Sequence, residues 1–249
     1  MTDIHYDKAP ILEAIIDVQV RYQAEPGLAV FADLMKSLQP RFPVAAPLST
    51  VGVQFGFPRA LAVPMHATNV VQSGFRLSTQ KNDRVALIQP RGFTFSHLPP
   101  YSEWATFRDE AMAVWEQFRS VTKPDGITRI STRYINRIEI PLPTFELSDY
   151  FHLRPEIPSQ GIPQMINAFF MQCQMAQPDF GNDVTAFMNM GSAGSSPVSQ
   201  HILLDFDLVS MRPMAAESEA VIELLDRLRM RKNELFEACI TDKVRELIK

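Results

Sequence analysis

Two stretches of strict two-residue alternation, at residues 12–22 and 128–140, constrain the fold of this chain more than any other feature of its sequence. Successive side chains of a β-strand point to opposite faces, so each stretch predicts a strand with one buried face. The first apolar face consists of Leu12, Ala14, Ile16, Val18, Val20 and Tyr22, and the second comprises Ile130, Thr132, Tyr134, Asn136, Ile138 and Ile140. The matched patterns predict two hydrogen-bonded neighbours near the middle of one sheet.

Both predicted strands are followed by a similar series of elements. A helix is expected at 28–38, short strands at 51–57, 70–79, 85–89 and 93–97, and an amphipathic helix at 101–121. After the second stretch come a short helix near 147–153, strands near 168–175, 184–190 and 202–209, and one long helix over 218–248. The glycine- and serine-rich segment 191–200 is interpreted as a long hairpin loop.

The helix at 101–121 has a stripe of large apolar residues that includes both tryptophans. Apolar residues at helical spacing are typical of a face packed on a core. The stripe comprises Tyr101, Trp104, Phe107, Ala111, Val114, Trp115, Phe118 and Val121. We therefore expect Trp104, Phe107, Trp115 and Phe118 to be buried against the first sheet.

The repeated order of elements predicts an α+β fold built from duplicated strand–helix–meander–helix units. The chain is expected to form one domain over residues 1–249, with pseudo-repeat halves at about 10–122 and 126–249 that share one antiparallel sheet. This arrangement resembles the saddle of the TATA-binding protein. Fold resemblance by itself assigns no function.

Charge and composition narrow the classes of partner. Twenty-four basic and 28 acidic residues give a formal net charge of −4, which disfavours nucleic-acid binding because such binding depends largely on phosphate neutralisation. The two cysteines, Cys173 and Cys239, form no metal-binding or redox motif and are expected to be reduced core thiols. No apolar run approaches the roughly 20 residues of a membrane span, so we expect a cytoplasmic protein without a membrane partner.

Motifs for catalysis or cofactor binding are not recognised. The glycine-rich segment at 191–196 lacks the lysine and the following helix of a phosphate-binding loop, and there is no Gly-x-Ser-x-Gly motif. His201, Asp205 and Asp207 share one face of a predicted strand and could bind a metal, but a salt-bridged sheet face is the favoured interpretation. No cofactor is predicted, and the sequence favours a non-enzymatic protein.

The polar faces of the two alternating strands form the main candidate site. One contains Glu13 and Asp17, and the other contains Arg129, Arg133 and Arg137. The favoured interpretation is that opposite charges pair across adjacent strands. The alternative is that the arginines bind an extended anionic partner, since guanidinium groups bind carboxylates and phosphates through forked hydrogen bonds.

Several motifs, in order, resemble a sporadically distributed family of uncharacterised bacterial proteins of about 250 residues. The motifs are PILEAIIDVQV, Tyr101-x-x-Trp104-x-x-Phe107, RYINRIEIP, LLDFD and LFEACITDKVREL. The resemblance implies a bacterial protein of the kind found among mobile or defence-associated genes. It transfers no catalytic residues to this chain.

Together these observations predict a non-enzymatic binding or adaptor protein whose partner is another protein encoded nearby. One alternative is a small-ligand-binding protein or enzyme with a polar pocket near Arg133, His201, Asp205 and Asp207. A second is nucleic-acid binding on the polar sheet face. Replacing Arg133 and Arg137 together is expected to weaken partner binding if they form the site, and to reduce only stability if they pair with Glu13 and Asp17.

Overall fold

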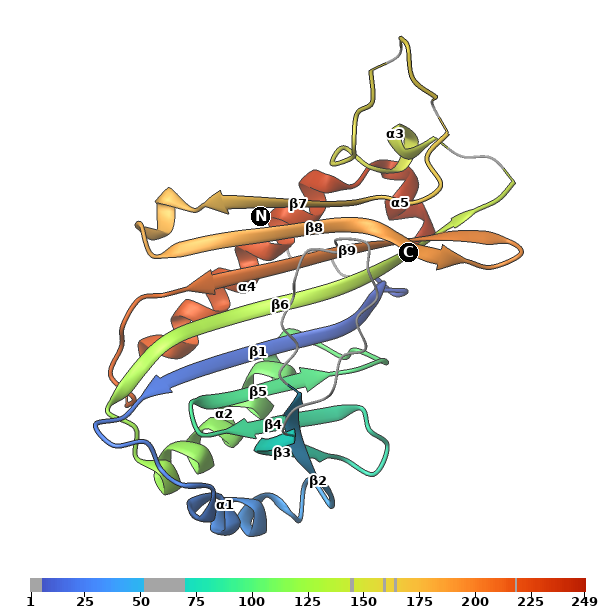
Figure 1. Cartoon of the computed structure of the whole chain (residues 1–249). Coiled ribbons are helices and arrows are strands. Elements are labelled where there is room, and N and C mark those ends of the chain that lie inside the picture. The colour runs from blue at the N-terminus through green and yellow to red at the C-terminus, as the bar shows by residue number, and fades with distance from the viewer. Residues whose placement is uncertain (1–5, 52–69, 144–145, 159, 164, 218) are drawn as a thin grey trace, which may run out of the picture.

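A computed structural model describes residues 6–51, 70–143, 146–158, 160–163, 165–217 and 219–249 (Figure 1). It has an α+β fold in which nine strands form one antiparallel sheet, in the order β2-β3-β4-β5-β1-β6-β9-β8-β7. The strands are β1 (Ile11–Arg21), β2 (Val44–Val51), β3 (Val70–Ser78), β4 (Arg84–Gln89), β5 (Gly92–His97), β6 (Gly126–Pro141), β7 (Phe170–Ala176), β8 (Val184–Ser195) and β9 (Ser199–Ser210). The helices are η1 (Leu28–Val30), α1 (Phe31–Leu38), α2 (Trp104–Thr122), α3 (Leu147–Tyr150), η2 (Pro178–Phe180), α4 (Ala220–Cys239) and α5 (Asp242–Leu247).

The two alternating strands, β1 and β6, are the fifth and sixth in this order and pair antiparallel, with Ile15 opposite Arg133 and Asp17 opposite Ser131. The prediction that they are neighbours near the middle of one sheet is confirmed. Their alternation is reflected in burial, since Ala14, Ile16 and Val18 are 0% exposed. The even-numbered residues of β1 therefore face the core.

Helices α2 and α4 lie on the same side of the sheet, behind it in the view of Figure 1. Helix α2 packs against β5, and α4 packs against β6 and β9. Phe107, Trp115 and Phe118 of α2 are buried as predicted. Trp104 is only half-buried, because it occupies the first residue of α2 and its Nε1 donates a hydrogen bond to Asp226 of α4 at 2.6 Å.

The single long helix predicted at 218–248 is wrong, because α4 ends at Cys239 and α5 begins at Asp242. Ile240 between them has an extended backbone, forms an isolated β-bridge with Phe151, and is fully buried. Pairing with Phe151 thus interrupts the helix although the apolar stripe continues through it. The hydroxyl of Thr241 donates to the carbonyl of Asp149 at 2.6 Å, which ties the break to α3.

Two further expectations need correction. The segment 191–200 does join a hairpin, but β8 extends to Ser195 and β9 starts at Ser199, so the loop is shorter than predicted. Cys239 is a buried thiol, whereas Cys173 lies half-buried on β7. Most of the strand predicted at 51–57 falls outside the described residues.

Among the described residues, none of the helices is both long enough and apolar enough to cross a membrane.

Candidate functional site

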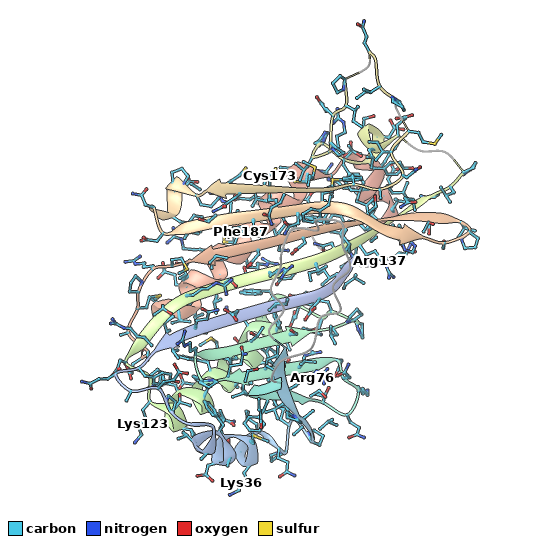
Figure 2. All side chains as sticks on the ribbon, in the orientation of Figure 1. Lys36, Arg76, Lys123, Arg137, Cys173 and Phe187 are labelled. Carbon is cyan, nitrogen blue, oxygen red and sulfur yellow. The ribbon has the colours of Figure 1, made fainter. Side chains whose placement is uncertain are left out.

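The sheet has a polar face opposite α2 and α4, formed by the odd-numbered residues 13–21 of β1, 129–139 of β6 and 201–209 of β9, together with residues 187 and 189 of β8. All eight candidate residues lie on it: Glu13, Asp17, Arg129, Arg133, Arg137, His201, Asp205 and Asp207. The arginines of β6 and the His201–Asp207 group of β9, which sequence patterns suggested separately, therefore belong to one surface. Figure 2 labels Arg137 on β6 and Phe187 on β8.

Arg129 lies between two carboxylates from different strands. One terminal nitrogen binds Asp17 of β1, and the other lies 3.4 Å from Oδ2 of Asp207 of β9. The side chains of these three residues are only 18–20% exposed. The hydroxyl of Thr94 on β5 donates to Asp17 Oδ2 at 2.8 Å. These contacts link four adjacent strands and partly neutralise both carboxylates.

Arg133 forms a forked pair with Asp205, with its Nε and Nη2 donating to the two carboxylate oxygens at 2.8 and 2.7 Å. This hydrogen bonding raises the pKa of Arg133, as does the charge of Asp205, against the opposing effect of burial. Asn189 donates to Asp205 Oδ2 at 3.0 Å, and Gln172 donates to Asn189 Oδ1 at 2.7 Å. The hydrogen-bonded chain fixes Asp205, which is only 7% exposed.

Polar residues at the margin of the face are held less firmly. Arg137 pairs with Glu139 at 3.0 Å, with side chains 42% and 52% exposed. The ring Nε2 of His201 lies 3.2 Å from the hydroxyl of Ser199. Glu13 lies half-buried opposite Ile135. Arginines thus pair with carboxylates across the strands, as expected. Arg129 pairs with Asp17, whereas Arg133 pairs with Asp205 rather than with Glu13.

Half-buried apolar side chains lie between the charged groups. Across the four strands, one row runs Ile15, Arg133, Asp207 and Phe187, and the next runs Glu13, Ile135, Asp205 and Asn189. The described charged residues of β1, β6 and β9 on this face are four arginines (Arg21, Arg129, Arg133, Arg137) and five acids (Glu13, Asp17, Glu139, Asp205, Asp207), a balance of −1. The face therefore has no surplus of positive charge.

Two hollows border the polar face. One, of about 350 Å³, is lined by residues that include Ile11, Arg137 and Glu139. The other, of about 380 Å³, includes Asp17 and Gln19 in its lining. Neither is lined by His201, Asp205 or Asp207. Within the described ranges, histidine, cysteine and acidic side chains form no group of three suited to a metal ion.

Asn189, Gln172 and Thr94 contribute to the site but were not predicted. In β8, every second residue from 184 to 190 is apolar, and this alternation could have placed Asn189 on the polar face. The apolar residues are Val184, Ala186, Met188 and Met190. Gln172 lies in a similar alternation, in which Met171, Cys173 and Met175 flank Gln172 and Gln174, so the same signal could have placed it on the polar face.

No known protein-family model matches this chain, and a search of the curated proteins finds no match.

Asp207→Asn tests the electrostatics of this face. Burial raises the pKa of Asp207 above its ordinary value of 3.8, although Arg129 and Arg133 act in the opposite direction. The folded state thus binds this proton more tightly than the unfolded state, and its contribution to stability decreases as the pH rises above 3.8 through the folded pKa. Denaturant unfolding between pH 4 and 7 should show stability shifting in favour of Asp207→Asn relative to wild type as the pH increases. A constant difference across that range would contradict this assignment.

Proposed function

We propose that this protein is a non-enzymatic binding or adaptor protein that recognises a partner protein through the polar face. The observation that supports this most strongly is the alternation of internally paired charges with half-buried apolar side chains across four strands. Protein interfaces combine apolar contact with polar groups whose hydrogen bonds are satisfied. The polar face has both components on a regular sheet.

The ion pairs favour a protein partner over a nucleic acid. Arg129 is already shared by two carboxylates, and Arg133 uses two of its nitrogens to bind Asp205. A phosphate backbone would have to compete with these carboxylates on a face without a positive surplus. A protein partner can instead pack on Ile15, Ile135 and Phe187 while the fixed pairs provide register and specificity.

The cellular and genomic setting that the sequence resemblance implies is consistent with the same proposal. We envisage a cytoplasmic protein whose partner is encoded beside it, in a mobile or defence-associated gene set. We also propose that the chain consists of two related units joined at β1 and β6. In support, each of these strands has the last strand of its own half, β5 or β9, on its other side.

The double variant Arg133→Ala/Arg137→Ala tests whether the polar face binds the partner. Co-expression with the products of neighbouring genes would identify a partner, and calorimetry would then measure its affinity. We expect binding to weaken by about tenfold or more, a loss of at least 1.4 kcal/mol, and the difference from wild type to shrink at high salt because exposed charges are screened. Lys36→Ala on α1 is the matched control, because it removes an exposed cation away from the polar face.

Stability must be measured on the same samples, since Arg133 also pairs with Asp205. If the double variant melts earlier but binds with wild-type affinity per folded molecule, the arginines only stabilise the sheet. Binding by isolated DNA or RNA that is lost in the double variant would instead support the nucleic-acid alternative.

A further inference from the structure

Strand β7 forms one edge of the sheet, and its outer hydrogen-bonding groups lack a strand partner among the described residues. A backbone hydrogen bond lies at each end of the β7–β8 ladder. Ser192 N donates to Phe169 O at one end and Gln177 N donates to Val184 O at the other, each at 3.0 Å. Hydrogen-bonded positions recur at every second residue of an antiparallel pair, so odd-numbered residues bond to β8. The backbone N–H and C=O groups of Phe170, Gln172, Gln174 and Ala176 therefore point outward.

The hydrophobic core also reaches this edge, where the described residues cover it only in part. Met171, Cys173 and Met175 lie on the helix side of β7, opposite Met190, Met188 and Ala186 of β8. The three β8 residues are 0–6% exposed, whereas Met171 and Cys173 are half-buried and Met175 is 37% exposed. A row of apolar side chains thus remains accessible where the core ends.

Exposed apolar residues are concentrated in the segment that leads into and includes β7. Of 13 large hydrophobic residues exposed in the described structure, six lie between residues 157 and 175, including Phe170 and Met175 of β7. They are Ile157, Ile162, Met165, Ile166, Phe170 and Met175. Phe170 and Met165 are 73% and 85% exposed. Concentrated exposed apolar surface marks an interaction site.

The sequence of β7, FMQCQMA, is nearly palindromic about Cys173. If two copies pair antiparallel about a two-fold axis at Cys173, Gln172 faces Gln174 of the other copy and Met171 faces Met175. The large Phe170 then faces the small Ala176. In this register the outward-pointing even-numbered residues face one another, as the hydrogen-bonded pairs of an antiparallel ladder require.

We propose that the protein forms a homodimer through antiparallel pairing of β7 with β7 of a second copy, centred on Cys173. Unpaired edge strands readily template pairing with another chain, and natural proteins commonly protect them with charges or proline. β7 contains neither, so an identical strand meets no charge repulsion. The two-fold axis places the helices of both copies on one side, and the two sheets become continuous.

This dimer satisfies the outward backbone groups and covers the apolar margin simultaneously. Its interface is isologous, because each copy contributes the same strand. A second copy is favoured over an unrelated extended segment because the strand complements itself at every position: Met with Met, Gln with Gln, Cys with Cys, and Phe with Ala. This edge adjoins the polar face proposed to bind a partner protein, because Gln172 of β7 also donates a hydrogen bond to Asn189 on that face.

Light scattering of the purified chain tests the assembly. We expect a mass corresponding to two chains of 28.2 kDa at micromolar concentrations. Gln174→Pro removes an outward N–H that β8 does not use and should yield a monomer at the same concentration, with the circular dichroism of wild type. Gln174→Thr keeps the N–H and should remain dimeric. Gln174→Lys, which leaves the backbone intact, should also weaken the dimer, because the two lysines would be diagonal neighbours roughly 7–8 Å apart.

Cross-linking tests the register independently of these variants. Opposite residues of a non-hydrogen-bonded pair have Cα atoms about 4.5 Å apart, within the range for a disulfide. Diamide should take up two electrons and two protons from two Cys173 thiols and produce a reducible covalent dimer, which Cys173→Ser should abolish. Burial raises the pKa of Cys239 to about 11, so that thiol should react slowly at neutral pH.

A monomer at tens of micromolar would overturn the proposal. So would a dimer that persists with folded Gln174→Pro and Gln174→Lys. A dimer sensitive to these substitutions that forms no Cys173 cross-link would overturn the register. Binding of an extended segment from another protein to a monomeric chain would assign the edge to that partner instead.

Discussion

Trp115→Ala is expected to reduce the free energy of unfolding by about 3–5 kcal/mol, the range for removing a large buried aromatic side chain. Trp115 is 2% exposed and stacks on Phe93 of β5 and Phe118 of α2, with ring centroids 6.1 and 6.0 Å away. Its removal leaves a cavity between α2 and the sheet that the surrounding rings cannot fill. Urea unfolding and the melting temperature would measure the effect.

Trp104→Phe is the matched control on the same helix. It keeps an aromatic ring and loses the hydrogen bond to Asp226, so a cost of about 1 kcal/mol is expected. A melting temperature unchanged by Trp115→Ala would show that the stripe on α2 does not pack on the core as described.

Arg129→Ala is expected to have the largest effect among substitutions of the polar face, about 2–4 kcal/mol at neutral pH. Removing one partner of a buried ion pair costs roughly 3–5 kcal/mol, and the partial exposure of this group reduces that figure. The variant leaves Asp17 and Asp207 without the guanidinium between them. Denaturant unfolding would measure the loss.

Two comparisons isolate the charge effect. Arg137→Ala should cost under about 1 kcal/mol, because its pair with Glu139 is exposed. The defect of Arg129→Ala should decrease on going from pH 7 to pH 4, because burial raises the pKa of Asp207 and this carboxylate becomes increasingly protonated over that range. A defect equally large at both pH values would indicate lost packing of the arginine stem instead.

The central strands could be predicted from sequence because β1 and β6 each have one buried face. Their alternation identified the face of the five candidate residues on these two strands and indicated that the strands are neighbours. The partners of the arginines could not be predicted in the same way. Arg133 meets Asp205 only through the β6–β9 register, which joins residues about 70 positions apart in the chain.

The C-terminal break was missed for a related reason. Helical periodicity persists through Ile240, and the extended backbone there depends on pairing with Phe151, a residue distant in sequence. Local patterns describe which face of an element is apolar. They do not reveal when a distant segment competes for its backbone hydrogen bonds.

The central position of β1 has a consequence for synthesis of the chain. One edge of β1 pairs with β5, but its other edge has no partner until β6, which starts at Gly126, has been synthesised. The second edge of β6 likewise has no partner until β9, which starts at Ser199, has been synthesised. During translation, the growing sheet therefore presents a long unpaired apolar strand at its edge twice. Such edges are prone to aggregation, and non-local pairing is slow. Ribosomes stalled before residue 199 should therefore hold a nascent chain that recruits chaperones, and release should follow once β9 emerges.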